Sequence, residues 1–551
     1  MTTQFTPPGP GFWELDRSHF PGGSTEIMKE LITESVREAY RKSFPINGIP
    51  AETMDMCFVN GFTYTRLRPL ISPDKPAKKN PPTFVLKIAS RLHPEFRRRT
   101  KAAAAALEDP PARAVIADWH ASLRPRLLAQ NLAYTDLDLT ALDDTELGDH
   151  LDELTAYLRE TLEHHFRLHT YDLAGIARLI HTAKGWGLTG AEVVPALAGA
   201  SPSTAAPTKK IAEIRETVAR AEVVPTSLDD VRNASPQAAQ LLDDYLRHHG
   251  SILYAGYDLD GPTLREAPDV LLATIVNDRS AAPIDDEQVD AIVDDLRNRL
   301  PEAHHAEFDA LLADAREAMD LRDDNGPMTA EWPTGLLRLA MLEAGRRLVG
   351  AGRLDEVDHI FGVARSELGP LMRGTGGPDA GELAARAARR AHEKTLEPPL
   401  SIGDPEPEPP LDALPEPLAN AIAMVQTVIE ELGMTSDPDE APTDGPRLTG
   451  AGIGTEPITG RACVAQDADE AFDKLEPGDI LVTRATSPAY NMVLTLVGGL
   501  VTADGGPMSH AAVLSRELNI PAVVGAPDAM DAIDDGATIT VDPAAGVVTI
   551  G

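Results

Sequence analysis

The stretch DGGPMSHAAVLSRELNIPAVVG, Asp504 to Gly525, decides the fold of the last part of the chain. The apolar run just before it, Leu500 to Ala503, is typical of a buried strand. The pair Gly505-Gly506 then ends that strand, because glycine weakens strands and allows a sharp turn. Two adjacent glycines also let the backbone approach a bound phosphate closely, so Gly505 and Gly506 are candidates for a phosphate-binding loop.

A helix is predicted directly after this turn, from Ser509 to about Leu518. Serine is a good N-cap residue, and it places His510 in the first helical turn. A helix N-terminus presents unpaired N–H groups and a partial positive charge, which stabilise a phosphoryl group. We therefore predict that His510 is a catalytic nucleophile that accepts a phosphoryl group, with Ser509 beside it. For an isolated Ser-His pair, the alternative is a histidine that only caps the helix or faces solvent.

Short β-rich runs and turns surround this helix. They predict strands at Arg461–Ala465, Ile480–Thr483, Leu500–Ala503, Ala522–Val524, Thr538–Val541 and Val547–Ile550. Since one good helix lies among these short strands, residues 448–551 are expected to form a small α/β domain.

A segment of different composition precedes this domain. Between Thr395 and Pro446 the sequence has 12 acids, 11 prolines and no Lys or Arg. Proline stiffens such a segment and like charges extend it. Residues 395–447 are therefore predicted to be a Pro-rich acidic linker with one short helix, at Leu418–Leu432.

Residues 1–394 are predicted to form a large, mostly helical domain, which makes the protein multidomain, α and α/β. In the stretch from Asp143 to Ile180, leucines recur at three- and four-residue steps from Leu147 to Leu162, the period of one buried helical face. Asp143 and Glu146 have the spacing of a capping pair at the start of that helix. The clearest strand pattern in this part is FVNGFTYTR, Phe58 to Arg66.

The charge balance of the 551-residue chain argues against some partners. With 86 acids and 50 Lys or Arg, the net charge is −36, so nucleic acid and anionic membranes are not expected as partners. Only two cysteines are present, Cys57 and Cys463, so no disulfide framework is expected. The N-terminus lacks a signal-peptide pattern, and the most apolar late run, Met492 to Val501, is too short to span a bilayer. We expect a cytoplasmic location.

The motif around His510 resembles the phosphohistidine loop of the PEP-utilising enzymes, the family of phosphoenolpyruvate synthase, pyruvate phosphate dikinase and rifampin phosphotransferase. In that family a swivelling β/β/α domain carries a histidine that shuttles a phosphoryl group between distant sites, and His510 matches this histidine. The resemblance continues in residues 452–454, 460–462, 478–482 and 486–488. Met508 replaces the threonine of the dikinases and Ser487 replaces an aspartate, so regulation at such a threonine is not expected.

The N-terminal part resembles the helical acceptor-binding part of rifampin phosphotransferase and phenylphosphate synthase. The similar stretches are Phe12–Gly23 (FWELDRSHFPGG), Asn60–Tyr64, Tyr245–Pro268, Gly352–Leu354 and Ser366–Leu368. The resemblance implies that residues 1–394 bind a small organic acceptor that carries a hydroxyl group.

The resemblance also implies an ATP-grasp domain, which is not evident in this sequence. The complete enzymes charge the histidine with a large ATP-grasp domain, and residues 1–394 are already assigned to the helical part. No Gly-x4-Gly-Lys-Ser/Thr loop is present, and the chain ends after the swivelling domain, without a PEP/pyruvate barrel. We expect the His-carrying subunit of a split ATP-dependent phosphotransferase. ATP and Mg²⁺ would be bound by an ATP-grasp subunit in trans, and neither by this chain alone.

Two alternatives to a split enzyme stay open. One is a phosphocarrier or regulatory binding protein whose acceptor site does not turn over. The other is a complete antibiotic phosphotransferase for rifamycin-like molecules, with a nucleotide site that the sequence does not reveal. ATP binding by the chain alone would favour the complete enzyme.

Polar residues of the helical part are candidates for the acceptor site. His165 and His169 continue the apolar stripe of their helix, so they either supply a base in an acceptor pocket or are buried core histidines. The His-x3-His spacing also occurs in metal sites, but no third ligand is evident, and no metal site is predicted. His248 and His249 are a second candidate pair.

Asp16 and Arg17, next to Trp13, are a third candidate for the acceptor site, with a solvated turn as the alternative. In the C-terminal part, Arg484 or Arg516 would brace a phosphate, because a guanidinium group fits phosphate oxygens. A surface position is the alternative for both arginines.

Overall fold

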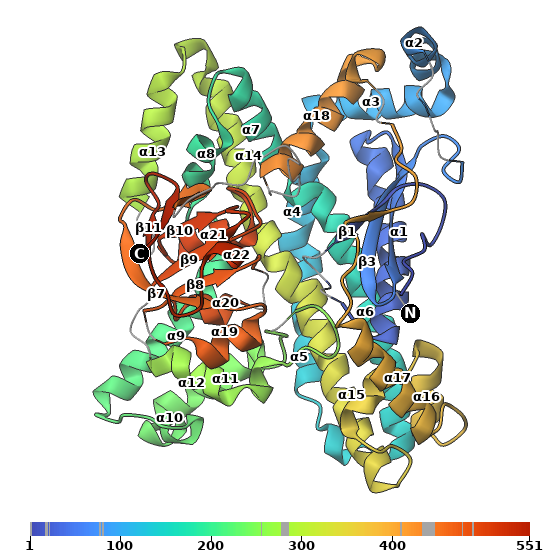
Figure 1. Ribbon diagram of the computed structural model, residues 1–551, viewed down its shortest axis with the longest axis vertical. Helices are drawn as coiled ribbons and strands as arrows, with labels where there is room; N and C mark the ends of the chain where they lie inside the picture. Colours follow the sequence, from blue (N-terminus) through green and yellow to red (C-terminus); the bar gives the residue numbers. More distant parts are fainter. Residues whose placement is uncertain are drawn as a thin grey trace.

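The computed structural model describes residues 3–16, 20, 22–75, 79, 82–254, 256–276, 286–407, 410–431, 447–476, 478–486 and 490–551. A large helical region comes first and a small domain with a mixed sheet comes last (Figure 1). The predicted class, multidomain α and α/β, is confirmed.

The helical region contains long helices that pack in pairs, and α1, α6, α14 and α15 make many of the contacts. The bounds of its helices are α1 Glu26–Asn47, α2 Thr83–Leu92, α3 Pro94–Glu108, α4 Pro111–Asp118, α5 Arg124–Thr135, α6 Asp144–Asp172, α7 Ala174–Gly185, α8 Gly190–Val193, α9 Pro202–Arg220, α10 Leu228–Ala234, α11 Pro236–His249, α12 Pro268–Val276, α13 Asp286–Arg299, α14 Glu302–Gly326, α15 Trp332–Gly350, α16 Arg365–Met372 and α17 Ala380–Glu393.

A four-stranded antiparallel sheet lies against this helical region, in the order β2-β3-β1-β4. Its strands are β1 Trp13–Asp16, β2 Ala51–Val59, β3 Phe62–Pro69 and β4 Ser401–Ile402. The stretch Phe58–Arg66 is therefore not one strand, as predicted, but the end of β2, a tight turn and the start of β3. Asn60 and Gly61 form the turn with positive φ values of 49° and 80°, which Asn-Gly pairs adopt readily.

The predicted helix Asp143–Ile180 is two helices. A capping box forms at its start as predicted, because the Asp143 carboxylate accepts from the backbone N–H of Glu146 and Glu146 reaches back to Asp143. The chain then breaks between α6 and α7 at Leu173, just after the buried Asp172. Leucine periodicity does not reveal this break, since the apolar stripe continues through both helices.

The segment predicted as a linker makes contacts with the helical region in its described part. β4 pairs with β1, and Glu406 forms an ion pair with Arg66 at 3.0 Å. Helix α18, Glu416–Glu431, packs against α3 and α7 and buries Leu418. Residues 432–446 of this segment lie outside the described residues.

The C-terminal domain has a sheet in the order β5-β12-β11-β7-β8-β9-β10-β6. Its elements are β5 Arg447–Thr449, β6 Ala451–Ile453, β7 Ile458–Val464, α19 Ala468–Lys474, β8 Ile480–Thr483, α20 Asn491–Leu494, β9 Gly499–Thr502, α21 His510–Glu517, β10 Ala522–Val524, α22 Ala529–Ala532, β11 Thr538–Asp542 and β12 Val547–Ile550. All six predicted strands are present, and the helix predicted after Ser509 is α21. The prediction missed β5 and β6, which are short strands at the two edges of the sheet.

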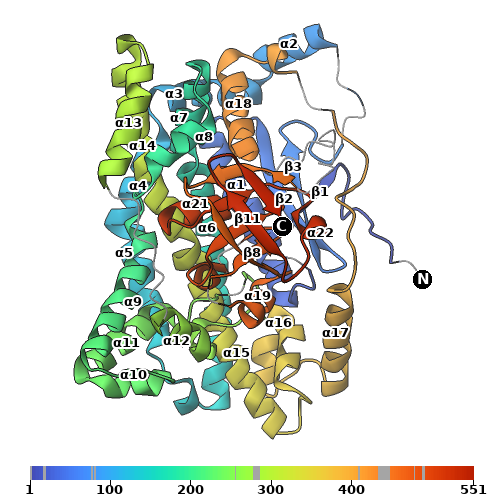
Figure 2. The same ribbon diagram turned by 60° about the vertical axis from the view of Figure 1, so that its left-hand side comes forward.

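The C-terminal domain is docked on the helical region, as both views show (Figures 1 and 2). Met508 and Val513 are buried in the hydrophobic core of the helical region rather than in the core of their own domain. Three hydrogen bonds hold the loop before α21 and the end of α21. Arg322 of α14 donates to the Met508 carbonyl at 2.9 Å, the Met508 N–H donates to the Glu431 carbonyl at 2.9 Å, and the Gly199 N–H donates to Glu517 at 3.1 Å.

Candidate active site

His510 is the first residue of α21, and Ser509 is its N-cap. The Ser509 backbone is extended, and its hydroxyl accepts from the Ala512 N–H at 3.3 Å. The serine hydroxyl is therefore engaged in holding the helix start, which fixes the position of His510 at the end of the helix dipole.

The turn before this helix needs glycine. Gly505 has a φ of +109°, and a Cβ atom there would lie 2.9 Å from the Ser509 hydroxyl. The Gly506 carbonyl accepts from the Ser509 N–H at 2.9 Å. The predicted phosphate loop thus brings the chain from β9 into the start of α21 in a few residues.

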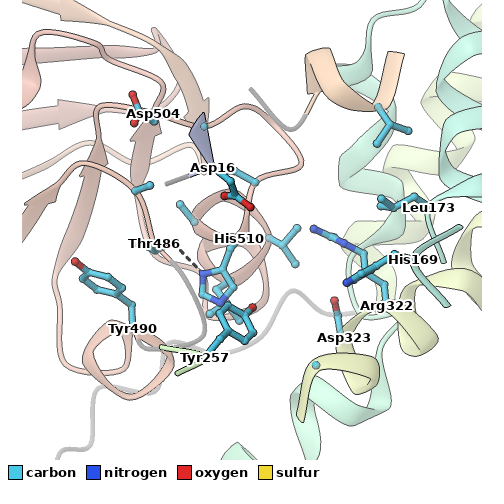
Figure 3. A pocket seen from close by; sticks show the side chains of 18 of the residues that line it. Asp16, His169, Leu173, Tyr257, Arg322, Asp323, Thr486, Tyr490, Asp504 and His510 are labelled. Atoms are coloured by element: carbon cyan, nitrogen blue, oxygen red, sulfur yellow. Dashed lines mark hydrogen bonds between the residues drawn. The ribbon is translucent and has the colours of Figure 1, made fainter. Parts of the chain in front are cut away.

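Thr486 orients the His510 ring. Its hydroxyl lies 2.9 Å from His510 Nδ1, the interaction drawn in Figure 3. Thr486 follows β8, and β8 is the parallel neighbour of β9. The carboxyl ends of adjacent parallel strands lie at the same edge of a sheet, which brings the two loops together.

The docked position changes the acid–base chemistry of His510. Burial beneath the helical region and the nearby positive charge of Arg322 lower the pKa of the imidazole to about 3. The ring is therefore neutral at neutral pH, the form in which a histidine nitrogen is a nucleophile or a leaving group.

His510 lines a cavity of about 3020 Å³ between the two domains. Figure 3 shows Asp16 and Tyr257 on either side of the His510 ring, with His169, Arg322 and Asp323 on the helical side of the cavity. Asp16 lies at the end of β1, so three parts of the chain that are distant in sequence meet at His510.

Among the basic residues of this cavity, Arg322 is the one best suited to bind a phosphate. One of its terminal nitrogens, Nη2, donates to the Met508 carbonyl, and the other, Nη1, is buried with no hydrogen-bond partner among the described residues. Its charge acts on His510 directly. The adjacent Asp323 accepts from the Thr204 hydroxyl at 2.8 Å, and burial raises the pKa of its carboxyl.

The two predicted histidines of α6 form one hydrogen-bonded chain beside this cavity. His169 Nδ1 lies 2.9 Å from the buried Asp172 carboxylate, and His169 Nε2 lies 3.1 Å from His165 Nε2. His165 Nδ1 in turn lies 3.1 Å from the Thr329 hydroxyl. The pair therefore combines both sequence interpretations, because His165 is buried in the core and His169 is partly exposed in the cavity.

Comparison with known proteins agrees with this geometry. Residues 475–546, which include β8, β9 and the whole His510 loop, match the family described as PEP-utilising enzyme, mobile domain. Residues 475–546 of the C-terminal domain are thus similar to the mobile domain of PEP-utilising enzymes, and we refer to residues 447–551 as the mobile domain. Its helix α21 carries His510 at the position where the sequence resemblance placed the phosphohistidine.

Similarity to curated proteins extends beyond the mobile domain. The chain is 30% identical over 328 residues to chondramide synthase of Chondromyces crocatus, which is 56% of this chain and 8% of that protein. It is 40% identical over 124 residues to phosphoenolpyruvate synthase of Aeropyrum pernix, 22% of this chain and 15% of that protein. It is 27% identical over 344 residues to rifampicin phosphotransferase of Streptomyces sviceus, 57% of this chain and 34% of that protein. The chain thus spans about a third or less of the length of each relative.

Other predicted residues lie elsewhere. His248 and His249 are at the C-terminal end of α11 and do not line the described cavity. His248 contacts the Asp244 carbonyl, and His249 packs against the ring of Tyr245, which does line the cavity. Arg17 lies outside the described residues.

The two arginines of the mobile domain differ. Arg484 lines the cavity, 3.9 Å from the Asp504 carboxylate. Arg516 is buried behind the loop and donates to the Pro507 carbonyl, and burial lowers the pKa of its guanidinium group to about 10. Arg516 therefore braces the loop and not a phosphate.

Sequence reasoning missed Arg322, Asp323, Tyr257 and Glu331. Arg322 and Asp323 belong to a charged run on a long helix, a pattern typical of a solvated face. Glu331 is buried, which raises the pKa of its carboxyl to about 8. No local signal marks these residues, because helices distant in the sequence bring them together at the cavity.

The described residues contain no group of three or more His, Cys, Asp or Glu side chains arranged to hold a metal ion. Among the described helices, none has the length and apolar character needed to cross a bilayer.

Proposed function

We propose that this chain relays a phosphoryl group through His510 to a hydroxyl group of a small organic acceptor bound in the cavity between the two domains. One observation carries the proposal: His510 of the mobile domain lines the same cavity as Asp16, His169 and Arg322 of the helical region. A mobile phosphohistidine domain docked over a pocket of another domain is the arrangement that the transfer step requires.

The His510 ring is prepared for this chemistry. With Thr486 at Nδ1, the ring turns Nε2 to the other side, so Nε2 is the nitrogen that would carry the phosphoryl group. In the transfer, the acceptor oxygen forms a bond to phosphorus while the N–P bond breaks, and the bonding electrons return to the imidazole. The acceptor proton passes to a basic group of the cavity, for which Asp16, His169 and Asp323 are the candidates.

Arg322 supplies the positive charge for the transferring phosphoryl group. It faces His510 across the cavity, its charge acts on the imidazole, and its Nη1 is buried without a hydrogen-bond partner among the described residues. A phosphoryl group on His510 would give this N–H an acceptor, and the positive charge would stabilise the transferring group. The protein's contribution is thus positioning and electrostatic stabilisation, as in other phosphoryl transfers.

The charging step is assigned to another protein. The resemblance to a family that charges its histidine with an ATP-grasp domain motivates this assignment. We place ATP and Mg²⁺ on an ATP-grasp subunit in trans, and the relay in the cytoplasm. The curated phosphotransferases among the relatives support a phosphotransferase reaction and leave the acceptor open.

A complete rifamycin-type phosphotransferase is the second candidate, favoured by the similarity to rifampicin phosphotransferase. A phosphocarrier without turnover is the third. Intact-mass measurement separates the three. The split enzyme gains one phosphoryl group from ATP only when an ATP-grasp protein is added, and loses it to an acceptor.

Self-labelling with ATP alone would favour the complete enzyme. Phosphohistidine that no alcohol discharges would favour the carrier. Phosphoramidate, a small phosphoryl donor, provides a partner-independent control that His510 is reactive.

A further inference from the structure

Helix α2 turns its apolar side to solvent. Phe84, Val85, Ile88 and Leu92 are exposed by 66%, 39%, 55% and 69%. The other side of the helix is held by the buried Ser90, whose hydroxyl donates to the Ala413 carbonyl at 3.1 Å. The helix is therefore fixed in an orientation that leaves its best apolar face uncovered.

These side chains form one continuous stripe, the α2 face. Positions 84, 88 and 92 are four residues apart, so they align along the helix, and Val85 lies next to them. Lys87 and Arg91 border the stripe on one side. An apolar stripe with a basic border is typical of a binding surface. Apolar side chains that are exposed singly are scattered over a surface and do not form a line.

The surrounding charge is opposite to that of the chain. Residues 83–101 contain six Lys or Arg and one Glu, whereas the whole chain has a net charge of −36. Arg97, Arg98 and Lys101 of α3 are exposed next to the α2 face. A basic and apolar surface on an acidic protein selects a partner with acidic groups around an apolar groove, and attracts it from a distance.

The position of the α2 face relates it to the mobile domain. Both views place α2 at the outer edge of the molecule (Figures 1 and 2). Helix α3 packs against α18, and α18 ends at Glu431, from which residues 432–446 lead to the mobile domain. A protein bound over α2 and α3 would thus sit beside the helix that tethers His510.

We propose that the α2 face is the docking surface for the ATP-grasp protein that charges His510, and that this partner presents an acidic, apolar groove. The inference rests on the proposed function and adds to it the surface that recognises the partner. The apolar stripe supplies the contact, while Arg91 and Arg97 select the acidic partner; Lys87 pairs with Asp412 at 3.4 Å.

Calorimetry of the full chain with a purified ATP-grasp protein of the same organism, without ATP, tests this. The variants Phe84→Ser/Ile88→Ser and Arg91→Glu/Arg97→Glu should each weaken binding at least about tenfold, the scale of losing central interface contacts. Controls are Val224→Ser, at a residue that is 84% exposed, and Arg220→Glu, which should change Kd by less than about twofold. All variants replace exposed side chains, so their unfolding temperatures should match the wild type.

Phosphoramidate labelling of His510 keeps the two proposals distinguishable, because it needs no partner. If the wild type binds the ATP-grasp protein but neither phosphoramidate nor ATP labels His510, the relay is refuted and the α2 face stays supported as a docking surface. Equal binding by wild type and both variants, or no binding by wild type, would overturn the α2 assignment. Two other results would also overturn it. If the chain sediments with anionic vesicles and Phe84→Ser/Ile88→Ser abolishes this, the face binds a lipid surface. If the chain self-associates and the same variant abolishes this, the face binds a second copy.

Discussion

In the proposed relay, His510 would have to be reactive in one place and stable in another, and its neighbours come from both domains. Thr486 belongs to the mobile domain and travels with the ring, so the ring orientation is constant. Arg322 and Asp16 belong to the helical region, so they act on His510 only when the domains are docked. Charging and transfer can therefore be altered separately by single substitutions.

His510→Gln should abolish phosphorylation by phosphoramidate and by any ATP-grasp partner, because the nucleophile is lost. Thr486→Val should slow labelling about tenfold, the cost of one hydrogen bond of about 1.4 kcal/mol. Intact-mass time courses measure both. Thr459→Val, at an exposed threonine of β7 whose hydroxyl lies 2.8 Å from the Thr540 hydroxyl, is the matched control and should retain labelling. Full labelling of His510→Gln would contradict the mechanism.

Arg322→Ala should leave charging by phosphoramidate unchanged and slow transfer from phospho-His510 to acceptor about 10- to 100-fold, the value of a charge-assisted hydrogen bond of about 1.5–3 kcal/mol. Single-turnover decay of the pre-labelled protein with and without an acceptor alcohol measures the effect. Arg126→Ala, at an exposed ion pair, is the control. Equal slowing of both half-reactions would show that Arg322 acts on the fold and not on the transferring group.

At the scale of elements, the start of α21 is held by groups from α14 and α18. Met508 inserts its side chain into the core of the helical region, while its backbone joins Arg322 and the end of α18. Lys184 of α7 also holds Glu431 at 3.0 Å, so α18 is braced at the point where the mobile domain docks. Met508 and its peptide groups are therefore one anchor of the docked domain, together with Val513 and the hydrogen bond from Gly199 to Glu517.

Met508→Ala should weaken docking, because truncating a buried methionine costs about 2–5 kcal/mol. We expect transfer to an acceptor to fall at least about tenfold, with labelling by phosphoramidate unchanged. Small-angle scattering should show a larger radius of gyration. Met530→Ala, in the separate core of the mobile domain, is the matched control and should not affect docking. Unchanged scattering and transfer for Met508→Ala would refute the anchoring role.

At the scale of the whole molecule, docking is linked to pH. The pKa of His510 is about 3 in the docked domain and returns toward the ordinary 6.5 when the domain leaves the helical region. Between these values the undocked form binds more protons. Docking should therefore strengthen as pH rises through this window and weaken as pH falls below about 6.5, by at most about tenfold per pH unit.

Scattering of wild type and His510→Gln between pH 5 and pH 8 checks this linkage. Asp16, His169, Tyr257 and Asp323 face the same cavity and are present in both proteins, so the difference between the two isolates His510. The wild type should expand toward acid pH more than His510→Gln. The same pH response in both would refute the linkage.

The sequence by itself determined the parts of this protein that depend on local pattern. The Gly505-Gly506 turn, the cap at Ser509 and the β-rich runs determine a small α/β domain with His510 at a helix start, because turns, caps and alternation act between near neighbours. The break at Leu173 was missed because the apolar periodicity continues across it. The turn at Asn60-Gly61 does carry a local signal, the Asn-Gly pair, which the strand prediction overlooked.

Only the tertiary structure decided what surrounds His510. Asp16, Tyr257 and Arg322 are far from it in sequence and meet it through the docking of two domains, which no local pattern encodes. His248 and His249 were the second candidate pair beside His165 and His169, yet packing separated them from the cavity. The physical reason is that long-range contacts depend on which faces of many helices are buried together, and each sequence segment specifies only its own face.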